Sequence, residues 1–278
     1  MSIRRFTAPL VALLAVGAAA PTPKRAPARI VSLNLCADQY LLALADRSQI
    51  AALSRYARDP QMSAAAAQVG TGVGRVPISG GSTEEVLALR PDLILVSPSR
   101  KRETKAALES QGLETLEIGP AESYAAILDR IRTVAAAVGH PARGAALIRT
   151  MNADLARLPR GGGRGRVAAY YQRRGFLTGT GTLVDDQMRR AGLANLAGKL
   201  HRPALSRLSL EQLVAARPDF VIVDTATDRV TDEGTEMMHH PSLDDIARID
   251  LPQAWMVCGG PAYVLAAQSL ARQLAARR

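Results

Sequence analysis

The sequence predicts an α/β protein of two lobes, each with a parallel-rich sheet flanked by helices, joined by a single long helix. The first observation is a stretch that occurs twice, at residues 82–96 and 209–223, with seven of its fifteen positions identical. A repeat at about half the chain length indicates two related lobes rather than a short-period solenoid. The second observation is that strand-like and helix-like segments alternate in both halves, which is typical of parallel sheets with crossover helices.

Each copy of the repeat predicts a helix, a tight turn and a buried strand. A serine, Ser82 or Ser209, is expected to cap the helix, and a Glu or Gln follows three residues later, as in a capping box. A proline then stops each helix, because it disfavours helical geometry at the residue before it. The unbroken apolar runs at residues 93–96 and 220–223 suit strands that are buried on both faces.

The first lobe is expected to span residues 29–140. Strands are predicted at residues 29–33, 50–53, 93–96 and 114–118, and further helices at residues 37–45 and 101–111. Five glycines and one proline within residues 70–81 indicate an irregular loop before the first copy of the repeat.

Helical spacing of apolar residues then continues towards the second lobe. Residues 121–138 form one predicted helix, and Pro141 suits the first turn of the next, which covers residues 142–158. We expect this bridging helix within residues 141–160 and the second lobe over residues 161–278. There, further strands are predicted at residues 166–171 and 255–257, helices at residues 183–191 and 263–277, and a polar turn with a short helix within residues 237–249.

The N-terminus predicts export. Residues 1–20 carry two arginines and then an apolar stretch that ends in small residues, which matches a secretory signal and is short for a membrane span. Residues 21–28 are a Pro-rich leader that need not fold. No later stretch is apolar enough to cross a bilayer, so we expect an exported protein that is soluble.

The chain has two cysteines, Cys36 and Cys258. An oxidising compartment permits one disulfide between them. Because they stand at opposite ends of the chain, we expect two separate buried thiols and keep the disulfide as the alternative.

The formal charge of +10 does not by itself indicate a nucleic-acid partner. The basic residues are mostly scattered arginines, and the chain holds three Phe and one Trp. A nucleic-acid platform needs a basic stripe with stacking aromatics between the charges. We therefore expect no nucleic-acid binding.

The segments that resemble enzyme motifs lack the spacing or the position in the chain that those motifs require. The Gly-rich segment 163–168 precedes a predicted strand, whereas a dinucleotide fingerprint follows one. Segment 192–199 has five residues between its glycine and its Gly-Lys, where a phosphate loop has four, and the Ser/Thr is missing. No G-x-S-x-G elbow is present. We expect no catalytic residue and no cofactor.

A polar cluster in the second lobe has two interpretations. Four such side chains are enough to hold a metal ion, and a polar turn that caps the following helix explains them equally well. The cluster consists of His239, His240, Asp244 and Asp245. The first lobe has no histidine before His140 to complete a shared site, so no metal site is predicted.

A ligand site is predicted where the strands end, because open parallel sheets bind ligands beyond the carboxyl ends of their strands. Arginine offers a planar set of donors for carboxylate, phosphate or catecholate oxygens. Tyrosine and tryptophan offer apolar area with a polar atom. The expected ligand-binding residues are Asn34, Arg55, Tyr56, Tyr171, Arg173, Arg174 and Trp255.

Several of these segments together resemble the bacterial periplasmic binding proteins for iron-siderophores, cobalamin and haem. The resemblance rests on residues 29–33 with their loop and helix, on the Arg-Pro-Asp turn within residues 84–96, and on Pro261 with Leu265-Ala-Ala-Gln268. It covers about residues 29–275. It implies a solute-binding protein, expected to be a monomer, whose stiff connecting helix permits only slight closure, and which hands its ligand to an ABC importer at the inner membrane.

The resemblance also implies a docking surface for the permease. In the family, one surface glutamate of each lobe meets arginines of the permease, and the matching positions here are Glu84 and Glu211. Each lies in the first turn of a predicted helix, and in a parallel α/β lobe the helix N-termini lie on the same side as the carboxyl ends of the strands. Both carboxylates are therefore expected on the rim of the cleft between the lobes. Stabilisation of the helix dipole explains either glutamate alone. It gives less reason for a glutamate at the same position in both copies.

The resemblance leaves the ligand open. The loop at residues 74–80 lacks the aromatic residues of the family's cobalamin binders, so an anionic ferric siderophore is favoured. Cobalamin and haem stay as alternatives, with Tyr56 or Tyr171 as a conceivable iron ligand for haem. Alternatives of another class are a periplasmic hydrolase or transferase on a related scaffold, and a zinc or manganese transport protein.

Overall fold

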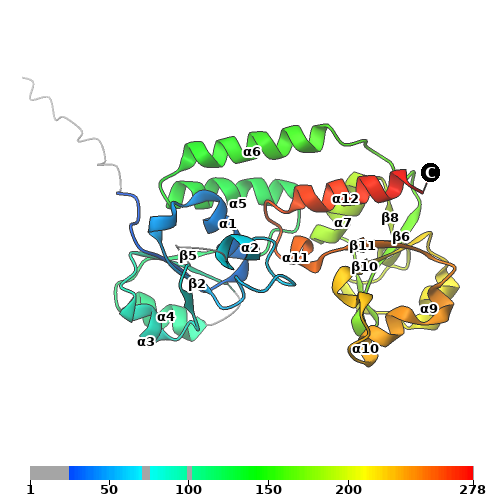
Figure 1. The fold of residues 1–278 in the computed structure, drawn as a ribbon, viewed down its shortest axis with the longest axis horizontal. Coiled ribbons are helices and arrows are strands. Elements are labelled where there is room, and N and C mark those ends of the chain that lie inside the picture. Colours follow the sequence, from blue (N-terminus) through cyan, green and yellow to red (C-terminus); the bar gives the residue numbers. More distant parts are fainter. Residues whose placement is uncertain (1–24, 71–75, 99–101, 278) are drawn as a thin grey trace, which may run out of the picture.

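The structure is a computed structural model that describes residues 25–70, 76–98 and 102–277. Figure 1 shows two lobes side by side along the longest axis, with helix α6 (Pro141–Ala156) on one side of them. The predicted secretory signal at residues 1–20 lies outside the described residues, as does part of the predicted loop at residues 70–81. The two-lobed α/β architecture confirms the predicted fold class.

The first lobe contains a sheet in which every neighbouring pair of strands is parallel. Its strand order is β3-β2-β1-β4-β5. The strands are β1 (Ile30–Ser32), β2 (Ile50–Ser54), β3 (Ile78–Ser79), β4 (Leu93–Val96) and β5 (Thr115–Glu117). The helices are α1 (Leu35–Leu44), η1 (Arg47–Gln49), α2 (Ala66–Gly70), α3 (Thr83–Ala88), α4 (Arg102–Ser110) and α5 (Tyr124–Ala137).

Both faces of this sheet are covered, which explains the unbroken apolar run of β4. Leu93 and Leu95 belong to the core that contains α1 and α5. Ile94 and Val96 belong to a second core, with Val86 of α3. Since successive side chains of a strand point to opposite faces, both sets of positions must be apolar.

The capping serines of the repeat are confirmed. The backbone N–H of Glu85 donates to Ser82 Oγ at 3.2 Å, and that of Gln212 donates to Ser209 Oγ at 3.3 Å. In the second copy Gln212 returns the bond to the Ser209 backbone, so the capping box is complete. In the first copy the Glu85 carboxylate instead accepts from the backbone N–H of Gly81, at 2.9 Å.

The second lobe has a mixed sheet of order β11-β10-β6-β7-β9, with β8 paired to β6. Its strands are β6 (Val167–Gln172), β7 (Phe176–Thr178), β8 (Ala194–Asn195), β9 (Leu205–Arg207), β10 (Phe220–Asp224) and β11 (Ala247–Leu251). Its longer helices are α7 (Leu183–Ala191), α9 (Leu210–Ala216) and α12 (Tyr263–Ala275). Its short helical turns are η2 (Arg173–Gly175), α8 (Leu196–Lys199), η3 (Thr225–Asp228), α10 (Glu233–Glu236), η4 (Met237–His239), η5 (Pro241–Leu243) and α11 (Gln253–Met256).

Two details of the second sheet differ from the prediction. Strand β7 runs antiparallel to both of its neighbours, β6 and β9. The chain reverses between β6 and β7 because Arg174 and Gly175 both have positive φ directly after β6. The predicted last strand at residues 255–257 is wrong, since Trp255 lies in helix α11. The edge strand is β11, which pairs in parallel with β10. Its sequence, Ala-Arg-Ile-Asp-Leu, alternates polar and apolar residues instead of forming an apolar run.

The chain passes from the first lobe to the second through helix α6, and helix α12 packs against both lobes. Helix α6 packs along α5 and also contacts α12. Helix α12 takes part in both cores. Its first turns contribute Tyr263, Val264 and Ala267 to the first lobe's core, whereas Ala266, Leu270 and Leu274 belong to the second lobe's core.

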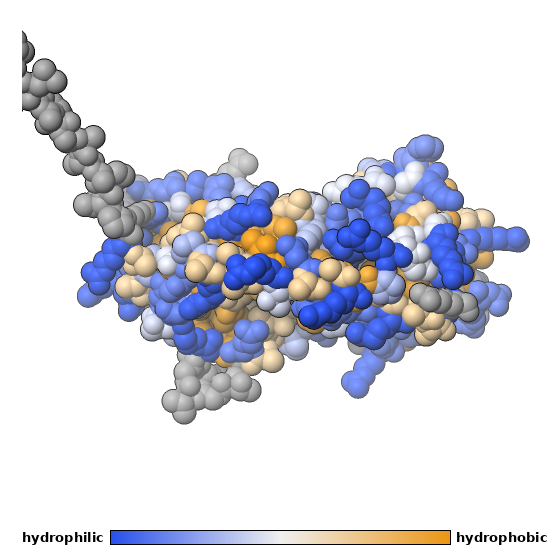
Figure 2. All heavy atoms as spheres, turned by 90° about the horizontal axis from the view of Figure 1, so that it is seen from above, coloured by the Kyte–Doolittle hydropathy of each residue, from blue (hydrophilic) through white to orange (hydrophobic). Residues whose placement is uncertain are grey.

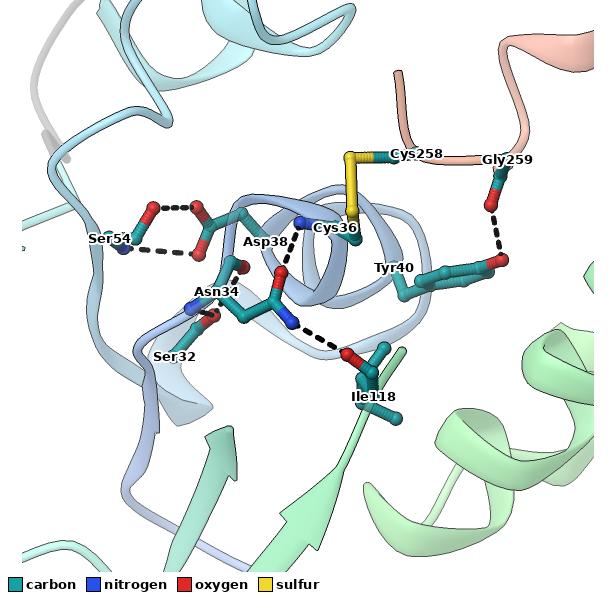
Figure 3. The surroundings of a disulfide bond; sticks show 9 residues. All are labelled: Ser32, Asn34, Cys36, Asp38, Tyr40, Ser54, Ile118, Cys258 and Gly259. Atoms are coloured by element: carbon teal, nitrogen blue, oxygen red, sulfur yellow. Dashed lines mark hydrogen bonds between the residues drawn. A yellow bond between two sulfur atoms is a disulfide. The ribbon is translucent and has the colours of Figure 1, made fainter. Parts of the chain in front are cut away.

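The expectation of two separate thiols is wrong, because Cys36 and Cys258 form a disulfide. Cys36 lies in the first turn of α1, and Cys258 lies in the turn between α11 and α12. The start of α12 returns to the first lobe, so this turn lies beside α1 (Figure 3). Because 222 residues separate the two cysteines, no local sequence pattern indicates that the chain returns to α1.

The outer face over α6 is mostly hydrophilic, with smaller apolar areas between the polar side chains (Figure 2). Within the described ranges, none of the helices combines the length and the apolar character needed to cross a bilayer.

Candidate functional site

A cavity of about 280 Å³ lies where the second lobe meets the segment that leads into α5. It opens at the carboxyl end of β6, as ligand sites of parallel sheets do. Its polar lining consists of Glu122, Tyr170, Gln172, Thr178, Thr182 and Gln253. Its apolar lining consists of Leu183, Val184, Ala204, Leu205, Met256 and Val257. Leu205 is 61% exposed, which is unusual for a leucine and leaves apolar surface open to a ligand.

The polar groups of the cavity are held by neighbouring elements. Gln172 Nε2 donates to Thr178 Oγ1 at 3.4 Å, across the pair β6–β7. Glu122 Oε2 accepts from the backbone N–H of Leu183 at 3.0 Å, at the start of α7. The backbone N–H of Gln253 donates to Asp224 Oδ1 at 2.9 Å, which ties α11 to the end of β10. Among the described lining residues there is no arginine, lysine or histidine. The described lining therefore offers amides and hydroxyls for hydrogen bonds, together with the Glu122 carboxylate.

Tyr171 was predicted as a ligand contact, and the structure contradicts this. Its side chain is fully buried, and its hydroxyl donates to the backbone carbonyl of Leu208 at 2.9 Å. Burial raises the pKa of Tyr171 to about 12, with a further contribution from the charge of Glu211, so the hydroxyl is protonated near neutral pH. Residues 170 and 172 face the cavity instead, because side chains alternate along β6.

The other predicted contacts of the second lobe lie next to the cavity but not in its lining. Arg173 and Arg174 are exposed in η2, and Arg173 Nη1 lies 3.5 Å from Asp232 Oδ2. Trp255 is half-buried and packs against the second lobe's core. It shares the four-residue helix α11 with the lining residues Gln253 and Met256.

In the first lobe, the predicted contacts are already engaged within the protein. Asn34 caps α1, because its Oδ1 accepts from the Cys36 backbone N–H, while its Nδ2 donates to the carbonyl of Ile118 at 2.6 Å (Figure 3). Arg55 and Tyr56 are exposed after β2. Arg55 Nη2 donates to Tyr56 Oη at 2.9 Å, and the guanidinium lies 4.9 Å from the centre of the ring. Neither residue lines the cavity of the second lobe.

Asp38 is a buried carboxyl that sequence reasoning missed. Its Oδ1 accepts from the Ser54 backbone N–H at 3.1 Å, and its Oδ2 accepts from Ser54 Oγ at 2.5 Å (Figure 3). Burial raises its pKa from 3.8 to about 6, although hydrogen bonds from Ser32 and Ser54 act in the opposite direction. Asp38 thereby fixes the end of β2 that presents Arg55. The signal in the sequence was a charged residue within the mostly apolar predicted helix 37–45.

We expect Asp38 to make the protein more stable as the pH falls from 7 to 5. Its folded pKa of about 6 lies above the unfolded value of 3.8, so folding favours the protonated carboxyl in this range. The free energy of unfolding should rise by about 1 kcal/mol between pH 7 and pH 5 from this group. Urea unfolding at both pH values measures it. Asp38→Asn should lack this increment, and an equal pH dependence in the variant would contradict the assignment.

The predicted docking glutamates are both exposed. Glu84 lies in the first turn of α3, and Glu211 lies in the first turn of α9. Hydrogen bonds lower the pKa of both carboxyls. For Glu84 the larger effect comes from its own backbone N–H and the smaller one from Ser82. For Glu211 the larger effect comes from Ser209 and the smaller one from its own backbone N–H. Figure 1 places α3 and α9 in different lobes, well separated along the long axis and both away from α6.

Both histidines of the polar cluster considered for metal binding have hydrogen-bond partners within the protein. His239 Nε2 lies 2.6 Å from the backbone carbonyl of Thr227. His240 Nδ1 accepts from the Ser242 backbone N–H at the start of η5. In the part of the chain that the structure describes, no three His, Cys, Asp or Glu side chains gather as they would around a metal ion.

Comparison with known proteins gives one family match. The family described as periplasmic binding protein matches residues 30–247. A cobalamin-binding protein of Halobacterium salinarum is 26% identical over 215 residues, which is 73% of this chain. The chain spans about half, 56%, of the length of that relative.

Solved structures share the fold. A possible iron-binding, periplasmic solute-binding protein of Staphylococcus epidermidis matches 90% of this chain and 99% of its own, with a TM-score of 0.71 at 15% identity. The periplasmic haem-binding protein RhuT of Roseiflexus sp. RS-1 matches 88% and 98%, with a TM-score of 0.68 at 24% identity. The vitamin B12-binding protein BtuF of Vibrio cholerae matches 90% and 97%, with a TM-score of 0.63 at 16% identity. At these identities the likeness shows the fold.

Proposed function

Because this chain belongs to the periplasmic binding protein family, we propose that it is the solute-binding component of an ABC importer. In this role it captures a metal chelate at the cavity beside the junction of the lobes and delivers it to a permease at the inner membrane. The family and its structural relatives are solute-binding proteins, not enzymes. The hydrolase or transferase alternative is therefore set aside. The predicted secretory signal at residues 1–20 supports a periplasmic location.

The observation that carries the proposal is the chemistry of the cavity. Side-chain amides and hydroxyls, supplied by Gln172, Gln253 and Thr178, stand beside the exposed side chain of Leu205. Such a lining suits a neutral, partly apolar chelate with peripheral amide groups, because each amide of the ligand then finds a partner. A corrinoid such as cobalamin has this chemistry. At about 280 Å³ the cavity holds one edge of such a ligand rather than all of it.

A second candidate is the anionic ferric siderophore that the sequence favoured. Its support is the group of exposed arginines at strand ends, Arg55, Arg173 and Arg174. Guanidinium groups recognise catecholate or carboxylate oxygens well. None of the three lines the cavity, so this candidate needs a ligand that sits further out. We rank it after the corrinoid. Haem ranks third. Two tyrosines were predicted as conceivable iron ligands for it, and only Tyr56 of the two is exposed.

Trp255 fluorescence tests the proposal. It is the only tryptophan and lies in α11, next to residues that line the cavity. The protein without residues 1–20 is titrated with cyanocobalamin, haemin and a ferric catecholate siderophore, with correction for absorbance and with equilibrium dialysis in parallel. We expect saturable binding of cyanocobalamin at one site. No saturable binding of any of the three would overturn the proposed function.

A further inference from the structure

The turn between α11 and α12 is where the second lobe is held against the first. Cys258 in this turn is bonded to Cys36 of α1. Tyr40, also in α1, donates its hydroxyl hydrogen bond to the carbonyl of Gly259 at 2.7 Å (Figure 3). The backbone N–H of Ala121 donates to the carbonyl of Cys258 at 3.4 Å. One covalent bond and two hydrogen bonds thus fix two consecutive residues of the turn to the first lobe.

The same turn continues into the wall of the cavity. Met256 and Val257 line the cavity and directly precede Cys258 in the chain. From the first-lobe side, Glu122 lines the cavity and directly follows Ala121. Cys258 and Gly259 therefore lie within two residues of the cavity lining, and Ala121 lies directly beside it. A shift of the turn would move the wall of the site.

The start of α12 packs in the first lobe's apolar core, whereas Gly259, earlier in the turn, meets the first lobe through its backbone. The Gly259 backbone has a φ of +57°, and a Cβ atom there would clash with the carbonyl oxygen of Ala121, so the two segments touch through their backbones. Gln39 of α1 lies near Gly260, and its buried Nε2 has no hydrogen-bond partner within the described residues. A polar contact with an unsatisfied buried group contributes little stability. The covalent link is therefore the strongest contact that Cys258 makes with the first lobe.

We propose that Cys36 and Cys258 are positioning residues of the ligand site. Their disulfide holds the cavity wall formed by Met256 and Val257 against the first lobe, and reduction loosens this wall while both lobes stay folded. Each lobe keeps its own apolar core, and neither core needs the disulfide to be complete. The turn lies between two anchors that remain: β11 in its sheet and the start of α12 in the first lobe's core.

Reduction needs a two-electron reductant, such as a dithiol protein or a phosphine. A thiolate of the dithiol attacks one sulfur, the Cys36–Cys258 bond breaks, and a mixed disulfide forms. The second thiol of the reductant then displaces the first cysteine. Both cysteines end as thiols, and the reductant ends as its own disulfide. Given the proposed function, the reduced protein should bind its chelate about tenfold more weakly.

Hydrogen exchange measured without any ligand tests the proposal separately from the proposed function. The oxidised protein is compared with protein reduced by tris(2-carboxyethyl)phosphine, which becomes its oxide, and with Cys36→Ala/Cys258→Ala. The backbone N–H groups of Val257 and Tyr263 donate to Gln253 and Gly260 within the turn. We expect these amides to exchange at least about tenfold faster once the disulfide is lost. The amides of β1 and β10 should keep their protection.

Tyr40→Phe is the matched control, because it removes the hydrogen bond to Gly259 and keeps the disulfide. It should speed exchange of the same amides by less than the loss of the disulfide does. Unchanged exchange in the turn after reduction would overturn the proposal. An equal rise in β1, β10 and the turn would also overturn it, since the disulfide would then be a general stabiliser and not a local one.

Discussion

Replacing Glu84 and Glu211 together by arginine should abolish transport and leave ligand affinity unchanged. Both carboxylates are exposed in the first turns of α3 and α9, one in each lobe. Neither lines the cavity, so the double variant should bind its chelate like the native protein. A permease that presents arginines to both sites would meet like charges at both sites of the variant, which costs several kcal/mol. Uptake of the labelled chelate by cells that carry the cognate permease measures the effect.

A matched control separates docking from the helix dipole. Glu103 and Glu233 are also exposed glutamates in the first turns of helices, α4 in one lobe and α10 in the other. Glu103→Arg with Glu233→Arg therefore repeats the change in net charge and in helix-dipole stabilisation. Uptake should be normal for this control. Normal uptake by the Glu84→Arg/Glu211→Arg protein would refute the docking role.

The elements that sequence predicted well have strong local signals. The repeated stretch combines a capping serine, a proline stop and an apolar run, and each of these features depends on residues within one short segment. Their structures accordingly agree with expectation at Ser82 and Ser209. β11 lacked such a signal, because it is an edge strand with an alternating pattern. The reversal of the chain between β6 and β7 depends on a positive φ at Arg174, which the local sequence does not predict.

The cavity lies at the carboxyl end of β6, where the sequence predicted a ligand site, but side chains other than the predicted ones line it. Side chains alternate along β6, so either Tyr171 or its neighbours, residues 170 and 172, can line the cavity, depending on which face of the sheet meets it. The second lobe buries both faces, so the apolar pattern of the sequence does not tell them apart. The disulfide was missed for a different reason. It requires α12 to pack against the first lobe, and this contact joins segments that are far apart in the sequence.

Removing the two amides of the cavity should weaken binding of cyanocobalamin about 100-fold. Gln172→Ala with Gln253→Ala leaves two amide groups of the ligand without partners in a partly buried site. Each unpaired group costs about 1–3 kcal/mol, and about 3 kcal/mol in total corresponds to two orders of magnitude in Kd. Neither glutamine belongs to a core cluster, so the thermal midpoint of the variant should stay near that of the native protein. Trp255 fluorescence and equilibrium dialysis give the Kd.

Arg173→Gln with Arg174→Gln is the reciprocal variant. It removes two positive charges directly after Gln172 but keeps side chains of similar length, and neither arginine lines the cavity. For an uncharged corrinoid the Kd should be unchanged, because guanidinium groups outside the cavity have no charge to neutralise. For a catecholate complex the effects of the two double variants on affinity are reversed. The arginine variant should then bind more weakly than the glutamine variant, since the arginine pair would supply the main attraction. If the arginine variant loses affinity and the glutamine variant keeps it, the ligand is anionic and binds outside this cavity. The pair of variants thus decides between the two ligand classes through the charge of the chelate alone, whichever member of its class the protein binds.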